Sequence, residues 1–255
     1  MQQQVVDINA DAGESFGRWR LGADEELIPL VTSVNIACGF HAGDPVTMRR
    51  SVILARECGV SVGAHPGYPD LLGFGRRRFA VSDADVVDYV VYQTGALAAV
   101  AATEGVALTH VKPHGALYGQ VSDSAELAGR LARELQSVQD GLALMIFPGA
   151  GAAAVAEAGL PVVRDAAADL EFGDDGKNII EPVPAAKDPE MVAQRAVGLA
   201  RGHVVTVSGS TIPLDPQTLC VHGDRPNAPQ IAKIVRARLA EAGITVRSAF
   251  VGEDL

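Results

Sequence analysis

Reactive side chains recur along this chain at short intervals, each time at or just after a run of apolar residues. The segments concerned are DINADAGE at 7–14, NIACGFHAGD at 35–44, GAHPG at 63–67, HVKPHG at 110–115 and CVHGD at 220–224. They supply carboxylates, imidazoles and an ammonium group, which can transfer protons, stabilise a developing negative charge or hold a metal ion. Glycine stands beside these groups, as expected where a backbone turns sharply or approaches a ligand. The pattern predicts one functional site assembled from several strand ends.

Individual residues in these segments also have structural explanations. Four histidines at strand ends, His41, His65, His114 and His222, are too many for ordinary core packing. Lys112, between an apolar run and Pro-His, is predicted to be a buried functional ammonium. Asp11 and Glu14 could instead cap a helix, and Asp44 is predicted to be a helix N-cap. Cys38 has no evident activating base and is not expected to be a nucleophile.

The same residues suggest a divalent metal ion. Catalytic zinc commonly takes three ligands from His, Asp or Glu and leaves one position for water. Asp11, His41 and His65 are the best three candidates, although no HxxxH or HExxH spacing supports them.

The elements that must position these side chains alternate between strand and helix. Strands are expected at 5–9, 32–37, 60–64, 108–112, 142–147, 160–164, 218–222 and 244–247, and helices at 45–58, 82–104, 122–135, 152–158, 188–202 and 228–242. Such alternation implies parallel strands with crossover helices. About eight units in 255 residues is the size of one (β/α) barrel, whose active site lies at the carboxyl ends of the strands.

Two kinds of segment interrupt this rhythm. VVTV and TIPL around Ser-Gly-Ser predict a β-hairpin insertion near 203–214. The stretches 66–81 and 166–186 are expected to be long functional loops. No Pro/Ser-rich linker divides the chain, so residues 1–255 are predicted to form a single domain.

Charge and composition exclude several classes of partner. The chain has 21 basic and 31 acidic residues, a net charge of -10, and its longest basic run is Arg76–Arg78. Nucleic acid and anionic membranes need clustered positive charge, so neither is an expected partner. No apolar run reaches about 18 residues, no signal segment is recognised, and the three cysteines have no CxxC spacing. A cytoplasmic protein without a membrane helix is therefore expected.

The longer motifs resemble a known family. DINADAGESFG, SVNIACGFHAGDP, GAHPGYPDLLGFGRR, VKPHGALY and LCVHGD are similar, in order and over nearly the whole chain, to the LamB/YcsF family, also known as the A subunit of 5-oxoprolinase. The resemblance implies an irregular (β/α) barrel, TIM-like and of the glycoside hydrolase/deacetylase type. It also implies part of a bacterial ATP-dependent 5-oxoprolinase, which converts 5-oxo-L-proline to L-glutamate and needs partner subunits B and C. ATP, with Mg²⁺, would be the co-substrate.

For this reaction, we hypothesise the following roles for the strand-end residues. Asp11 or His65 would act as general base toward water, and His114 as acid toward the ring nitrogen. Lys112 would stabilise an oxyanion or hold a phosphoryl oxygen. The residues expected to bind substrate are Asn9, Glu14, Asn35, His41, Asp169, His222 and Asp224.

The chain departs from the family pattern between Asp165 and Pro182. Leu170, Phe172 and Glu181 stand where the pattern has Arg, Tyr and Arg. Arginines there would be natural partners for a carboxylate or phosphate, so this loop lacks two expected guanidinium groups.

Two other functions are compatible with the same residues. One is a stand-alone metal-dependent amidase or deacetylase with Asp11, His41 and His65 as ligands. The other is a non-catalytic protein that binds a small carboxylate and delivers it to a partner. The sequence also leaves a homo-oligomer open.

Overall fold

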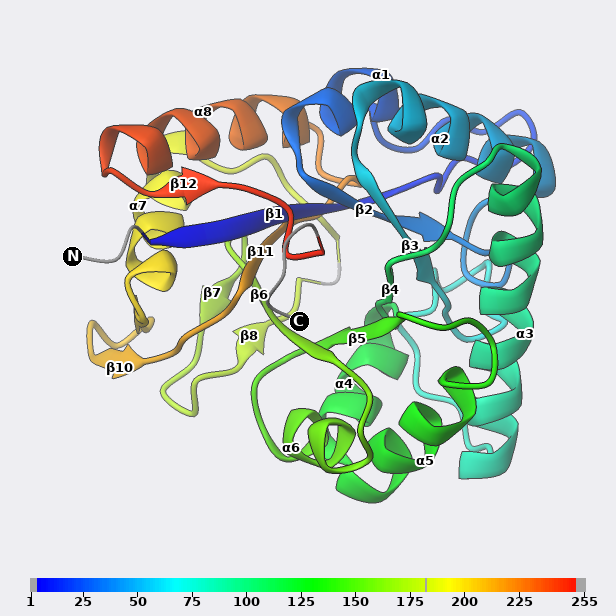
Figure 1. Cartoon of the computed structure of the whole chain (residues 1–255). Coiled ribbons are helices and arrows are strands. Elements are labelled where there is room, and N and C mark those ends of the chain that lie inside the picture. The colour runs from blue at the N-terminus through cyan, green and yellow to red at the C-terminus, as the bar shows by residue number, and fades with distance from the viewer. Residues whose placement is uncertain (1–3, 182, 251–255) are drawn as a thin grey trace.

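Seven parallel strands close into a barrel in the computed structural model, which describes residues 4–181 and 183–250 (Figure 1). In order around the ring they are β1 (Val5–Ala12), β2 (Ser33–Ala37), β3 (Ser61–His65), β4 (His110–Val111), β5 (Ala143–Ile146), β6 (Val162–Ala167) and β11 (Thr218–Val221). β11 closes the ring by pairing with residues Asp7 to Ala10 of β1. The predicted irregular (β/α) barrel is confirmed.

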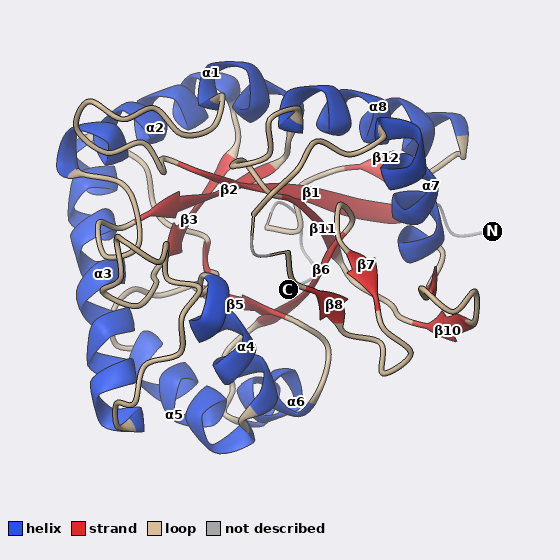
Figure 2. Cartoon of the chain, turned by 180° about the vertical axis from the view of Figure 1, so that it is seen from behind, coloured by secondary structure: helices blue, strands red, loops and turns tan. Residues whose placement is uncertain are grey.

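The helices form an outer layer around this barrel (Figure 2). They are α1 (Asp24–Leu27), α2 (Pro45–Cys58), α3 (Asp83–Thr103), α4 (Gly115–Asp123), α5 (Ala125–Leu135), α6 (Ala150–Glu157), α7 (Pro189–Ala200) and α8 (Ala228–Glu241), with a 3₁₀ turn, η1 (Ile28–Leu30). Local sequence explains where several begin. Asp44 caps α2 by accepting from the backbone N–H groups of Val46 and Thr47, as predicted, and Ser82 and Asp85 form a capping box on α3.

The strand predicted at the C-terminal end forms but does not enter the ring. β12 (Thr245–Val246) pairs with Val5 and Val6 of β1, whereas β2 pairs with β1 only from Asn9 onward. β12 therefore covers the first part of a β1 edge that β2 leaves open. The barrel has seven strands rather than the eight that the strand–helix rhythm suggested.

Two hairpins lie outside the barrel. β9 (His203–Val205) and β10 (Thr211–Pro213) pair antiparallel, which confirms the predicted insertion. β7 (Glu171–Phe172) and β8 (Asn178–Ile179) form a second hairpin within a stretch expected to be a loop. The two hairpins are joined, because the backbone N–H of Val207 donates to the carbonyl of Phe172. Short strands paired only with each other leave little periodicity in the sequence to recognise.

Further differences concern α4 and α3. The helix expected at 122–135 forms as α5, but the sequence analysis did not predict the helix before it, α4, which begins directly after His114 and ends at Asp123. α3 is long and apolar enough to meet a length-and-composition test for a membrane-crossing helix, contrary to the sequence expectation. In the fold α3 contacts α2, α5 and β3, and one of its faces is buried against the barrel.

The barrel interior beneath the strand ends is polar as well as tightly filled. Alternate residues of β1 point inward, so Asp7, Asn9 and Asp11 lie one above another. His110 of β4 is fully buried, and its Nε2 lies 2.7 Å from Asn35 Oδ1. A Cβ atom on Gly63 of β3 would overlap that imidazole ring.

Gly63→Ala is therefore expected to destabilise the protein by about 1–3 kcal/mol, because the new methyl group overlaps His110. Gly95→Ala in α3 is the control, since its Cβ would meet no atom within 4 Å and alanine favours a helix. Urea denaturation of the full chain measures both. Equal stability of the two variants would contradict this account of the barrel interior.

Candidate functional site

A cavity of about 350 Å³ lies at the carboxyl ends of the barrel strands, where the sequence predicted the site. Asp11, His65, Lys112, Asp165 and His222 line its polar part. Leu170 and Ile180, which flank the β7–β8 hairpin, line an apolar part. The volume suits a small molecule with one polar and one apolar face.

Lys112 lies at the base of the cavity and is 4% exposed. Its Nζ donates to Asn9 Oδ1 at 2.9 Å, to Asp11 Oδ1 at 3.2 Å and to Cys220 Sγ at 2.9 Å, and lies 3.6 Å from Asp165 Oδ2. Burial alone would lower the pKa of Lys112, but the charges of Asp11 and Asp165 outweigh it and raise that pKa well above its usual value. Lys112 is therefore buried, as predicted, and its surroundings favour the ammonium form.

Asp11 is an ionised carboxylate in the same network. Its Oδ1 accepts from Asn35 Nδ2 at 2.8 Å and lies 3.4 Å from His65 Nε2, while Oδ2 lies 3.9 Å from His222 Nε2. Burial would raise its pKa, but the electrostatic influence of the neighbouring His65 and Lys112 outweighs burial and holds the pKa well below the usual value. An ionised carboxylate in this place can accept a proton or orient a neighbouring imidazole.

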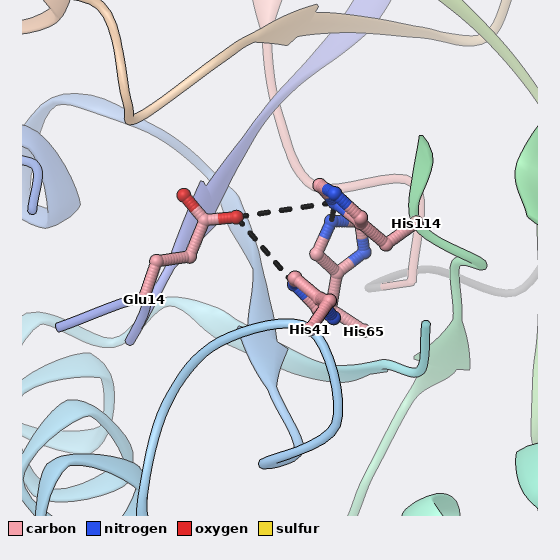
Figure 3. A group of neighbouring side chains, drawn as sticks. All are labelled: Glu14, His41, His65 and His114. Atoms are coloured by element: carbon pink, nitrogen blue, oxygen red, sulfur yellow. Dashed lines mark hydrogen bonds and ion pairs between the residues drawn. The ribbon is translucent and has the colours of Figure 1, made fainter. Parts of the chain in front are cut away.

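Three histidines and Glu14 form a cluster beside Asp11 (Figure 3). Glu14 Oε1 lies 3.6 Å from His41 Nε2 and 3.9 Å from His114 Nδ1, and His65 Nε2 lies 3.0 Å from His114 Nδ1. Burial lowers the pKa of His41 and of His114 well below the usual value, which favours neutral rings. Burial, reinforced by Asp11, raises the pKa of Glu14 well above the usual value. This donor set can hold a metal ion.

This grouping differs from the metal ligands suggested by the sequence. His41 and His65 are together as expected, but Glu14 and His114 complete the cluster. Asp11 belongs to a neighbouring group with Cys220 and His222.

Asp169 supports His222 from behind. Asp169 Oδ1 lies 2.9 Å from His222 Nδ1, and Oδ2 accepts from Arg225 Nε at 2.6 Å. Burial would raise the pKa of Asp169, but His222 and Arg225 outweigh it and lower that pKa to about 2. Asp169 is fully buried and orients His222, whereas the sequence analysis expected it to bind substrate.

The other residues expected to bind substrate separate into two sets. Asn9 and Asn35 are fully buried below the cavity, where Asn35 Nδ2 donates to Asn9 Oδ1 at 2.8 Å. Asp224 lines the cavity and accepts from Arg76 at 2.7 Å, which ties the 66–81 loop to the end of β11. The asparagines support Lys112 and Asp11, whereas Asp224 forms part of the cavity wall.

Sequence reasoning missed several residues of the site. Asp165 of β6 accepts from Tyr118 at 3.0 Å, and Cys220 accepts from Lys112. The sequence did offer a signal for Asp165, because this residue directly follows the strand expected at 160–164. Tyr118 lies on the unpredicted α4, one turn after His114.

The three loop residues that differ from the family pattern all make specific contacts in the structure. Phe172 is fully buried, and Leu170 is buried at the cavity wall. Glu181 accepts from Arg225 Nη1 at 2.9 Å and forms an ion pair with Lys187. The absent loop arginines are thus replaced here by apolar packing and by an acid that binds other cations.

The fold and site define an α/β-barrel protein with a cavity at its strand ends that is lined by buried, charged side chains. The chain belongs to the LamB/YcsF family, whose model matches residues 6–252. It is 48% identical to the A subunit of 5-oxoprolinase from Symbiobacterium thermophilum, over 94% of each chain. The crystal structure of lactam utilization protein from Thermus thermophilus is 43% identical, with a TM-score of 0.86, over 95% of this chain and 98% of that one.

A more distant likeness concerns the fold alone. The structure of T48 deacetylase with substrate superposes with a TM-score of 0.51 at 14% identity, over 96% of this chain and 87% of that one. This chain therefore shares its overall barrel fold with that protein.

Asp169→Asn is expected to lower the free energy of unfolding at pH 7 by about 2–3 kcal/mol, because the ionised native carboxylate is lost. The native pKa of about 2 lies below the unfolded value of about 3.9, so this stabilisation is complete above about pH 5 and is lost progressively as pH falls through the unfolded value toward 2. Urea denaturation between pH 7 and pH 3 should show the difference from wild type shrinking only below about pH 5. The exposed Asp215→Asn is the control, and a pH-independent loss for Asp169→Asn would contradict the ion-pair explanation.

Proposed function

We propose that this chain is the A subunit of an ATP-dependent 5-oxoprolinase and opens the lactam of 5-oxo-L-proline to L-glutamate with subunits B and C. The observation that carries the proposal is the buried Lys112 ammonium beside the ionised Asp11 at the base of a small cavity. The name of the Symbiobacterium relative and that of the Thermus structure support this substrate class.

Lys112 is placed to donate a hydrogen bond to an oxygen atom of a substrate. All three of its N–H bonds have partners, but one is the sulfur of Cys220, which is a weak acceptor. Replacing that sulfur with an amide oxygen or a phosphoryl oxygen would cost little, and the new contact would strengthen as negative charge develops on the oxygen. Lys112 would thus stabilise negative charge that develops on the amide oxygen, or hold a phosphoryl oxygen once that oxygen is phosphorylated.

Asp11 is suited to act as the base toward that water. It is ionised and lines the cavity beside Lys112. Lactam opening to glutamate is unfavourable by itself, and coupling to ATP would drive it by activating the amide oxygen as a phosphate ester. Water would then add to the carbon, the ring C–N bond would break with protonation of nitrogen, and the acyl phosphate would be hydrolysed to glutamate and phosphate. The predicted roles of His65 as base and His114 as acid stay predictions.

The substrate carboxylate needs a cationic partner, and the loop between Asp165 and Pro182 lacks the arginines that the family pattern has there. Arg76 and Arg78 line the cavity from the opposite loop, and the Arg78 side chain is exposed at its mouth. A guanidinium binds a carboxylate in two parallel hydrogen bonds. Arg78 would therefore hold the carboxylate, and Leu170 and Ile180 would contact the ring methylenes.

Cofactor, partners and location belong to the same proposal. ATP with Mg²⁺ would be the co-substrate, and the name of the Symbiobacterium relative, which designates one subunit of an enzyme, supports partner subunits. A cytoplasmic location agrees with three cysteines that form no disulfide.

Glutamate release from 5-oxoproline and ATP, with and without subunits B and C, tests the function. Asp11→Asn and Lys112→Ala should each lower turnover of the complete complex by at least about 100-fold, because each removes a charge that acts in the transition state. The exposed Lys233→Ala is the matched control, and circular dichroism checks the fold. Near-normal turnover in both site variants would refute the assignment. Amide hydrolysis without ATP or partners would favour the stand-alone hydrolase, and substrate binding with no contribution to turnover would favour the delivery role.

Arg78→Ala should raise KM for 5-oxoproline by about tenfold or more and change kcat less, because it removes a contact present in both ground and transition states. The exposed Arg130→Ala is the control. Steady-state kinetics of the complete complex measures the two constants. An unchanged KM would place the carboxylate elsewhere.

A further inference from the structure

Four potential ligand atoms converge in the cluster formed by Glu14, His41, His65 and His114 (Figure 3). Each residue offers one atom, and these atoms all lie within 4.8 Å of one another. All four residues are at most 5% exposed. The cluster is therefore a closed group of electron-pair donors next to the cavity.

Two backbone carbonyls set the tautomers of two of these rings. His65 Nδ1 lies 2.7 Å from the carbonyl oxygen of Lys112, and His114 Nε2 lies 2.8 Å from that of Phe74. Carbonyl oxygens only accept hydrogen bonds, so both of these nitrogens carry hydrogen. In neutral rings the opposite nitrogens, His65 Nε2 and His114 Nδ1, then present lone pairs to each other across 3.0 Å.

A carboxyl oxygen of Glu14 adds a further lone pair to this arrangement. Glu14 Oε1 has no hydrogen-bond partner among the described residues, and neither ring nitrogen of His41 has one. Leaving buried polar atoms without partners is costly. A cation placed between these atoms would satisfy the facing lone pairs and the unpartnered carboxyl oxygen together.

We propose that Glu14 Oε1, His65 Nε2 and His114 Nδ1 bind a divalent transition-metal ion of the zinc class. Tetrahedral ligands at about 2.1 Å from an ion lie roughly 3.4 Å apart. The separations of 3.0 Å between the two nitrogens and 3.9 Å between Glu14 Oε1 and His114 Nδ1 lie on either side of that value. Two imidazoles and one carboxylate leave a fourth position open for water. Imidazole ligands also distinguish this ion from the Mg²⁺ that accompanies ATP.

His41 is a positioning residue in this site rather than a ligand. Its ring is stacked on that of His114, with centroids 3.8 Å apart and planes 3° from parallel. An ion in the plane of His114 therefore lies outside the plane of His41. Within residues 4–181 and 183–250, His41 also lacks the hydrogen bond from its second ring nitrogen that orients most metal-bound histidines. Its Nε2 instead faces Glu14.

The neighbouring group of Asp11, Cys220 and His222 is not a second metal site. The ammonium of Lys112 already lies within hydrogen-bonding distance of Asp11 and Cys220 and supplies the positive charge there. The proposed ligand set thus contains Glu14 and His114 in place of the Asp11 and His41 considered from the sequence.

The inference does not depend on the proposed substrate. His65 and His114 line the cavity, so a bound ion would lie at its edge. With their free nitrogens bound to the ion, neither histidine would carry a proton at those atoms, and Asp11 would remain as the base.

Metal binding to the purified full chain tests the inference directly. The protein is stripped with a chelator and dialysed, then titrated with Zn²⁺ by calorimetry, and its metal content is measured by mass spectrometry. About one tightly bound ion per chain is expected, retained in excess Mg²⁺. Absence of stoichiometric binding would overturn the proposal.

Variants locate the ion. Glu14→Gln and His114→Gln should each weaken Zn²⁺ binding by at least about 100-fold, since each removes a ligand. His41→Phe, which keeps a stacked ring, should retain the ion. His203→Gln on β9 is the matched control, because His203 lies outside the cluster. Unchanged binding in both ligand variants, or loss only in His203→Gln, would refute the site.

A spectroscopic measurement on the wild-type chain guards against variants that do not fold. Co²⁺ in the proposed site should give the intense visible absorption of a four-coordinate ion, displaced by one equivalent of Zn²⁺. A weak octahedral spectrum would contradict the proposal. A doubly protonated His65, detected by ring ¹⁵N shifts that persist when Zn²⁺ is added, would show that a proton supplies the missing charge and would also overturn it.

Discussion

The buried ammonium of Lys112 is the interaction on which the site depends. It follows β4 and contacts Asn9 and Asp11 of β1 and Cys220 of β11, and it lies 3.6 Å from Asp165 of β6. A desolvated ammonium is tolerated only where acceptors and opposite charges surround it. Lys112 therefore requires strands that are distant in sequence to present their polar groups at the same level along the barrel axis. Its positive charge also favours the ionised form of Asp11 beside the cavity.

The site divides charge between two adjacent regions. Lys112 offsets the carboxylates of Asp11 and Asp165, while Asp169 holds His222 and Arg225 on the other side. The cluster of Glu14, His41, His65 and His114 lies next to these pairs but contains no lysine or arginine of its own. The low dielectric of the interior strengthens the attraction between paired charges. It also raises the cost of leaving the electron-pair donors of the cluster without a partner. The ion pairs of Lys112 and Asp169 thus adjoin the cluster of Glu14 and the three histidines, which is suited to receive a cation.

The strand-end chemistry and the barrel could be predicted from the sequence because both follow from local patterns. Asp44 and Ser82 mark helix starts, and Asp11, His65 and Lys112 stand at strand ends, where a barrel gathers its reactive groups. The place of β12 outside the ring could not be predicted, since a two-residue pairing has the same composition inside or outside a barrel. The β7–β8 hairpin was missed because its strands are equally short.

The sequence by itself determined which groups are available and that they would meet at one end of a barrel. Only the tertiary structure decided which groups pair. Asp11 belongs with Lys112 rather than with His41, Glu14 belongs with the histidines, and Asp169 lies behind His222 instead of facing a ligand. The physical reason is that pairing of charges and lone pairs depends on distances of a few ångströms between different strands. Those distances follow from strand register and ring closure, and no spacing along the chain records them.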